Sequence, residues 1–274
     1  MTFGALILLF LGGCLGGLMA GLLGIGGGLV FVLIFTNYLS AVNAPETTLA
    51  HYIVANSMFA IFFAGISGSV KHYFNNNFYF KPVLISGIAA SVTSLITSYL
   101  INTGTWYSKE VFSVIFISIT SYVAYRILMG KDKDDQSDRV EGFSLGIFLI
   151  IGGLGGILAA LSGVGGGVIM VPLLTRLLHI NIKKATAISL GVITIMALVS
   201  SVYALFTAAG ERVQIPHAYG LIILPMVLPV AAGCIICSPF GVTLAKRIPV
   251  QVIKVIFASF LLLVIFNMIY NLWL

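Results

Sequence analysis

The chain has 274 residues, of which 59% are hydrophobic and only 8% are charged. This balance excludes a soluble globular domain and is typical of a polytopic membrane protein. The formal net charge is +6, but the basic residues lie in short segments beside apolar runs. They therefore indicate membrane topology and contact with the lipid bilayer, and no nucleic-acid motif accompanies them.

Apolar runs long enough to cross a bilayer recur along the chain. Eight full spans are predicted: Phe3–Leu23, Leu49–Val70, Pro82–Ile101, Val111–Met129, Gly142–Leu161, Ala185–Ala209, Ala218–Pro239 and Val250–Tyr270. Two shorter runs, Leu29–Leu39 and Val168–His179, would rise only about 16 to 18 Å as helices, against a hydrocarbon core of roughly 30 Å. We therefore expect an all-α membrane protein with eight long spans and two half-helices.

An internal repeat divides the chain into two halves. A shift of 139 residues lays Gly13–Thr36 over Gly152–Thr175 with 12 of the 24 paired positions identical. A weaker match pairs the segment around Ser57 with the segment around Ser189. The repeat predicts a first transmembrane unit over residues 1–129, a cytoplasmic linker over 130–141 and a second unit over 142–274.

The lysines and arginines suggest how each half crosses the membrane. If each half made four plain crossings, the 14 positive charges would divide seven against seven, which is unusual. If each glycine-rich segment returns the chain to the face it left, only Lys109 and Arg212 lie outside. This topology predicts inverted repeats, each with a Gly-broken helix or re-entrant hairpin plus three full spans. It places both termini outside.

The half-helices each follow a glycine-rich segment, which we name the first glycine segment (Gly24–Gly28) and the second glycine segment (Gly163–Gly167). The first N–H groups of a helix lack internal partners and carry a partial positive charge. Successive glycines let such amides curve around an anion. The pattern predicts that the two helix ends, one from each half, converge on one anion site near the membrane midplane. The alternative is that the glycines only allow close helix packing, as we expect for those within the preceding spans.

Other binding chemistries find little support in the sequence. Glu46, Glu110 and Glu211 lie at predicted span ends, so no carboxylate is expected in the middle of a span, where a cation carrier usually needs one. The four histidines are scattered without metal-ligand spacing. We therefore expect no metal and no cofactor.

Three stretches resemble one known family. GVGGGVIMVPLL at 163–174, ATAISLGV at 185–192 and the first copy GIGGGLVFVLIF at 24–35 look like the TauE/SafE sulfite exporter family, also called the toluenesulfonate uptake permease family. The resemblance covers essentially the whole chain and implies secondary transport of sulfite, sulfoacetate or another organosulfonate across the cell inner membrane of a bacterium or archaeon. Carried onto matching positions, it implies substrate binding by Gly26, Gly27, Gly28, Ser57, Gly165, Gly166, Gly167 and Ser189. The first copy departs from the pattern, because Leu33 stands where Pro172 would pair.

Further polar residues are candidates in their own right. Asn56, Ser57, Thr186 and Ser189 can donate side-chain hydrogen bonds to a substrate, or bond their own backbone instead. His51 is a candidate for carrying a coupling proton or gating the entrance, or is an interfacial residue with a satisfied ring. Cys234 and Cys237 share a helix face, where packing is favoured over redox chemistry.

We expect a secondary transporter that moves a small sulfur oxyanion or organosulfonate across the membrane by alternating access. A proton or sodium ion is the candidate coupling ion. The alternatives are a channel or permease for another small anion and, less favoured, a membrane-embedded enzyme. Ser162 would be the candidate nucleophile of such an enzyme, but no histidine base lies in the middle of a predicted span.

Overall fold

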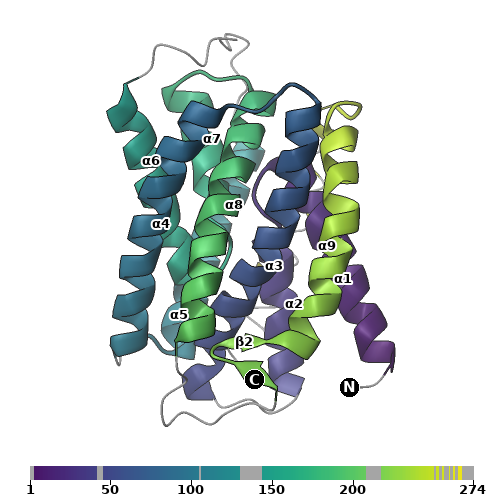
Figure 1. The fold of residues 1–274 in the computed structure, drawn as a ribbon, viewed down its shortest axis with the longest axis vertical. Coiled ribbons are helices and arrows are strands. Elements are labelled where there is room, and N and C mark those ends of the chain that lie inside the picture. Colours follow the sequence, from purple (N-terminus) through teal and green to yellow (C-terminus); the bar gives the residue numbers. More distant parts are fainter. Residues whose placement is uncertain are drawn as a thin grey trace.

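The computed structural model of the chain is a bundle of helices with one short β-hairpin at its lower end (Figure 1). It describes residues 3–41, 46–104, 106–129, 144–207, 217–249, 251–252, 255, 259, 262 and 265–266. The elements are α1 (Phe3–Leu23), α2 (Gly28–Ala41), α3 (Glu46–Phe74), α4 (Phe80–Thr103), α5 (Lys109–Met129), α6 (Leu145–Ser162), α7 (Gly167–Leu177), α8 (Ile182–Phe206), β1 (Ala218–Tyr219), β2 (Ile222–Ile223) and α9 (Leu224–Ala245).

Six of the described helices are long and apolar enough to cross a membrane, namely α1, α3, α4, α6, α8 and α9. Each overlaps a span expected from the sequence, so the prediction of a multi-pass membrane protein is confirmed. α5 also forms where a span was expected, although the apolar part that can be described, Glu110–Tyr122, is shorter than a full crossing. The expected eighth span lies mostly outside the described residues, and the expected linker over 130–141 lies wholly outside them.

The span expected over Ala218–Pro239 begins differently from the prediction. β1 and β2 pair antiparallel over its first residues, with Gly220 in the turn at a φ of 59°. α9 starts only afterwards, with Pro225 in its first turn, where the missing N–H of proline leaves no helical hydrogen bond unmade. The helix is therefore displaced toward the C-terminus and continues to Ala245.

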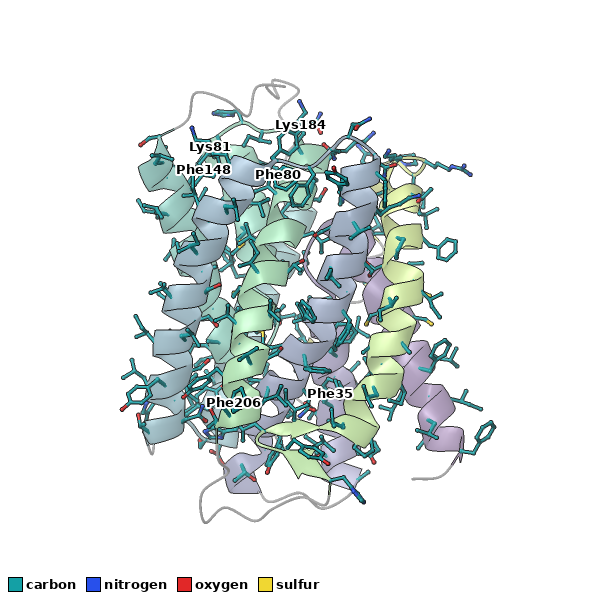
Figure 2. All side chains as sticks on the ribbon, in the orientation of Figure 1. Phe35, Phe80, Lys81, Phe148, Lys184 and Phe206 are labelled. Carbon is teal, nitrogen blue, oxygen red and sulfur yellow. The ribbon has the colours of Figure 1, made fainter. Side chains whose placement is uncertain are left out.

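Each glycine segment reverses the direction of the chain. Four residues separate α1 from α2, and four separate α6 from α7. The α1 and α2 pair opens toward the lower end of the bundle, where Phe35 of α2 lies (Figures 1 and 2). The α6 and α7 pair opens toward the upper end, where Phe148 of α6 lies. The two glycine segments consequently lie in the interior, between the two ends of the bundle.

Matched helix contacts surround this interior. α3 and α8 pack against each other, α1 packs along α9, and α6 packs along α4. Glycine allows the two outer pairs, α1 with α9 and α4 with α6, to approach closely. A Cβ at Gly13 would lie 2.2 Å from the Val230 carbonyl oxygen, and a Cβ at Gly152 would lie 2.2 Å from the Ser86 carbonyl oxygen. The expected packing role of these two glycines, one in each half, is confirmed.

Candidate functional site

Both glycine segments adopt backbone conformations that favour glycine. Corresponding residues of the two repeats have positive φ: Gly24 (68°), Gly26 (86°) and Gly27 (73°) in the first, and Gly163 (69°), Gly165 (94°) and Gly166 (68°) in the second. Residues with a Cβ rarely adopt this region. The Gly-x-Gly-Gly pattern of each copy is therefore what the two chain reversals require.

The two glycine segments contact each other through their backbones. A Cβ at Gly28 would lie 2.4 Å from the Val164 carbonyl oxygen, and a Cβ at Gly167 would lie 2.6 Å from the Gly24 carbonyl oxygen. No larger side chain fits at either position without movement. The structure thus brings together the predicted residues Gly26, Gly27 and Gly28 from one half with Gly165, Gly166 and Gly167 from the other.

Gly27 and Gly166 also hold their segments against the preceding helices. A Cβ at Gly27 would lie 2.3 Å from the Gly16 carbonyl oxygen, and one at Gly166 would lie 2.4 Å from the Gly155 carbonyl oxygen. These two glycines therefore have a packing function that is independent of any ligand. Gly166 additionally occupies the N-cap position of α7, where no side chain caps the helix.

A cluster of backbone N–H groups at the glycine segments has no hydrogen-bond partner among the described residues. In the first turns of α2 and α7, the N–H groups donate α-helical or 3₁₀ hydrogen bonds only from the third helical residue onward. The unpaired amides belong to Ile25, Gly26, Gly27, Gly28 and Leu29 in the first half and to Gly165, Gly166 and Val168 in the second. All of these residues are buried. Because buried N–H groups are nearly always paired, the interior has an excess of donors at this point.

The surroundings of this cluster favour a negative charge. The N-termini of α2 and α7 each contribute a partial positive charge. Ile61 and Ile193 line the cluster, since a Cβ at Gly26 would lie 3.1 and 3.2 Å from their side chains. The sequences of α1, α2, α6, α7, α8 and α9 contain no Asp or Glu. The arrangement can therefore bind an anion through backbone donors in an apolar environment.

The predicted hydroxyl residues flank the glycine segments from the central helices. The Ser189 hydroxyl of α8 donates to the Gly24 carbonyl over 2.8 Å. Thr186 also lies against Gly24, because a Cβ at Gly24 would lie 2.6 Å from the Thr186 Cα. The Thr186 hydroxyl, however, donates to the Lys183 carbonyl. Ser57 of α3 is fully buried, and its hydroxyl has no hydrogen-bond partner among the residues that the structure describes.

Asn56 holds the β-hairpin to α3. Its side-chain amide donates to the Tyr52 carbonyl over 2.7 Å and to the Leu221 carbonyl over 3.0 Å, and its oxygen accepts from the Ile223 N–H over 2.9 Å. Both amide hydrogens are used in these bonds. In this conformation Asn56 therefore has no N–H available for a substrate, although the sequence identifies it as a candidate.

His51 of α3 and Tyr107, which lies between α4 and α5, contact each other. Their rings meet edge to face with 5.6 Å between centroids, and His51 Nε2 lies 3.5 Å from the Ile101 carbonyl oxygen. The Tyr107 hydroxyl donates to the Leu161 carbonyl of α6, two residues before the second glycine segment. Burial raises the pKa of Tyr107. Sequence reasoning missed Tyr107, because nothing near it in the chain indicates a long-range partner.

The cysteines fit the packing interpretation. Cys234 is buried and its thiol lies 3.5 Å from the Gly13 carbonyl oxygen. A Cβ at Gly17 would lie 2.8 Å from the Cys234 Cα, so α1 and α9 cross closely at Cys234. All three cysteines, including Cys14 and Cys237, are free thiols. Within the described residues no three His, Cys, Asp or Glu side chains gather as a metal site would require.

Comparisons with known proteins give a family and several relatives. The family model described as "Sulfite exporter TauE/SafE" matches residues 9–268. The chain is 30% identical over 268 residues to a "Probable membrane transporter protein" of Haemophilus influenzae, covering 97% of this chain and 98% of the relative. It is 26% identical to a protein with the same description from Methanocaldococcus jannaschii, covering 93% and 91%. A third such protein, from Bacillus subtilis, is 22% identical, with 99% and 98% covered. No solved structure matches.

Proposed function

The chain belongs to the sulfite exporter TauE/SafE family, and on this premise we propose that it is a secondary transporter of a small sulfur-containing anion such as sulfite, sulfoacetate or another organosulfonate. The observation that carries the proposal is the cluster of unpaired, buried N–H groups on the two glycine segments. Sulfite and sulfonate groups each present three oxygens that accept hydrogen bonds. Such a group complements a concave set of backbone donors without needing a fixed cation.

The magnitudes suit a transporter, which must release what it binds. A hydrogen bond to a charged group contributes about 1.5 to 3 kcal/mol, and a helix N-terminus adds up to about 2 kcal/mol in a partly buried site. Three such bonds, reduced by the cost of immobilising the anion, correspond to a Kd in the range of roughly 1 μM to 1 mM. A permanent lysine or arginine in the site would bind the anion more tightly and slow its release.

We propose that the two halves act as inverted repeats and expose the site alternately to each face. Two observations support this mechanism. The glycine segments meet in the interior. The packing of α1 against α9 is matched by the packing of α6, the counterpart of α1 in the second half, against α4. A relative movement of the halves that separates the segments on one side would open a path to that side. In the proposed mechanism this movement breaks the contact between Gly28 and Val164.

The proposed orientation places the upper end of the bundle in the cytoplasm. Lys81 and Lys184 lie at that end, whereas Phe206 lies at the lower end (Figure 2). The last turns of α3 and α7, which contain the basic residues Lys71 and Arg176, also lie toward the upper end (Figure 1). An excess of Lys and Arg on the cytoplasmic side is the usual bias of an inner-membrane protein. Both termini are then outside, and His51 lies toward the outer face, where we propose it as the carrier of a coupling proton.

Transport is preferred to catalysis because of the chemistry of the site. Backbone amides and a serine hydroxyl can bind an anion, but neither they nor the isoleucine side chains around them supply an acid–base pair for a reaction. A channel or permease for another small anion uses the same donors, because backbone N–H groups also bind halides. The two functions differ in transport kinetics and in anion selectivity. Uptake by a carrier saturates with substrate concentration and prefers sulfur anions, whereas flux through a general anion channel does not saturate and includes chloride.

Uptake of radiolabelled sulfite into liposomes that contain the purified protein tests the proposal. We expect saturable uptake that is inhibited by excess unlabelled sulfite or sulfoacetate and not by chloride, and that is absent from protein-free liposomes. Linear, non-saturating flux with equal inhibition by chloride would favour a general anion channel. A lack of flux for every sulfur anion would refute the proposed substrate class.

A further inference from the structure

Two serines at equivalent positions of the central helices face the glycine segments. On α8, Ser189 lies between Thr186, which contacts Gly24, and Ile193, which contacts Gly26. Ser57 occupies the same relative position on α3. It lies three residues after Val54, whose Cα would be 3.3 Å from a Cβ at Gly163, and four residues before Ile61, whose side chain would be 3.1 Å from a Cβ at Gly165.

Helical spacing directs Ser57 toward the cluster of unpaired amides. Residues three and four apart lie on one face of a helix. Val54 and Ile61 both contact the second glycine segment, and Ser57 stands between them on that face. The side chain is 0% exposed, so its hydroxyl points into the protein interior and not toward lipid.

The two serines differ in their hydrogen bonds. Ser189 donates to the Gly24 carbonyl over 2.8 Å, whereas the Ser57 hydroxyl has no partner in the described part of the chain. A buried serine in a helix can ordinarily donate to the carbonyl four residues earlier, as Ser91 and Ser201 do over 2.8 and 2.6 Å. Ser57 does not use the corresponding carbonyl of Ile53. An unpaired, fully buried hydroxyl beside unpaired amides marks a place where a ligand completes the hydrogen bonding.

We infer that Ser57 is the side-chain donor to the bound anion and that Ser189 is not. This inference rests on the proposed function and assigns unequal roles to the two repeats. Ser57 of α3 donates its O–H to an anion oxygen alongside the backbone amides of the glycine segments. Ser189 of α8 instead fixes the first glycine segment in its turn and has no hydrogen to spare.

The donor at Ser57 has a consequence for selectivity. A hydroxyl hydrogen bond to a charged oxygen is short and directional, and it contributes more than a neutral bond. Sulfite and sulfonate oxygens accept it, whereas a spherical halide gains less from its direction. Removal of the hydroxyl therefore reduces the preference for a sulfur oxyanion over chloride, in addition to weakening the binding itself.

The test compares Ser57→Ala, Ser189→Ala and Ser201→Ala, with Ser201 as a control for losing a buried helical hydroxyl away from the glycine segments. The Kd for sulfite is measured by ligand-induced thermal stabilisation of the purified protein, and the Tm without ligand reports the fold. For Ser57→Ala we expect an unchanged Tm without ligand and a Kd raised by roughly 10-fold to 100-fold. Ser189→Ala lowers the Tm and raises the Kd by a smaller factor.

Wild-type affinity in Ser57→Ala, or an equal loss of affinity in Ser201→Ala, would overturn the assignment of Ser57. A larger loss in Ser189→Ala at an unchanged Tm would overturn the unequal roles of the two serines. If the unsubstituted protein binds neither sulfite nor sulfoacetate, the proposed function fails, and the role of Ser57 fails with it. That result is distinct from a protein that binds sulfite equally well with and without the Ser57 hydroxyl.

Discussion

Adding one methyl group at the contact between the glycine segments should weaken both the fold and the anion site. Gly28 and Gly167 have ordinary helical φ values, so alanine is compatible with their backbone. The new Cβ would nevertheless lie 2.4 Å from the Val164 oxygen or 2.6 Å from the Gly24 oxygen, about 1 Å inside an ordinary contact of about 3.5 Å. Overpacking of this kind costs about 1 to 3 kcal/mol, and the displaced segments move their amides away from the anion.

Gly153→Ala is the matched control, because its Cβ would lie at an ordinary 3.5 Å from Thr93 Cγ2. Thermal unfolding should show Gly28→Ala and Gly167→Ala lowered in Tm by roughly 2 to 10 °C, whereas Gly153→Ala is unchanged or slightly stabilised through helix propensity. The Kd for sulfite should rise at least about tenfold in the first two variants only. Wild-type Tm and affinity in both would mean that the segments do not meet as described.

Three further experiments test other parts of the structure. Tyr107→Phe removes the bond to the Leu161 carbonyl and should lower the free energy of unfolding by about 0.5 to 1.5 kcal/mol. Because burial raises the pKa of Tyr107 above its usual value of about 10, the phenol stays protonated, and this loss should be the same at about pH 6 and at about pH 9. A loss that disappears on raising the pH would contradict the argument. Asn56→Ala removes all three bonds to the hairpin and its own helix and should lower stability by about 2 to 4 kcal/mol, while an unchanged Tm would show that the hairpin is held by other contacts. In a background without the native cysteines, a membrane-impermeant maleimide should label Lys109→Cys from outside intact cells and should label Lys184→Cys only after permeabilisation; the reverse pattern would invert the proposed topology.

The helices and the meeting of the two glycine segments could be predicted from the sequence for a simple physical reason. Long apolar runs specify spans by length alone, and the duplicated Gly-x-Gly-Gly pattern specifies two chain reversals, because those φ values favour glycine. The repeat then implied that the two reversals meet. Gly28 contacting Val164 and Gly167 contacting Gly24 are the realisation of that expectation.

Long-range pairings could not be predicted in the same way. Asn56 looked like a substrate donor, yet it bonds residues of a hairpin more than 160 positions away, and that hairpin itself replaced the start of an expected span. Tyr107 reaches the Leu161 carbonyl from a short connection that carries no motif. Ser57 and Ser189 look equivalent in the sequence, and only their surroundings separate a satisfied hydroxyl from an unsatisfied one.

The location of the bound anion is tested most directly with selenite, which matches sulfite in shape and charge and carries a strong anomalous scatterer. In a crystal of the protein soaked with selenite, the anomalous difference map should show a peak between the first and second glycine segments, within hydrogen-bond distance of the Ser57 hydroxyl. Excess sulfite in the soak should remove that peak. An empty interior, with selenium only beside Arg176 or other basic residues near the surface, would contradict an anion site built from the glycine segments.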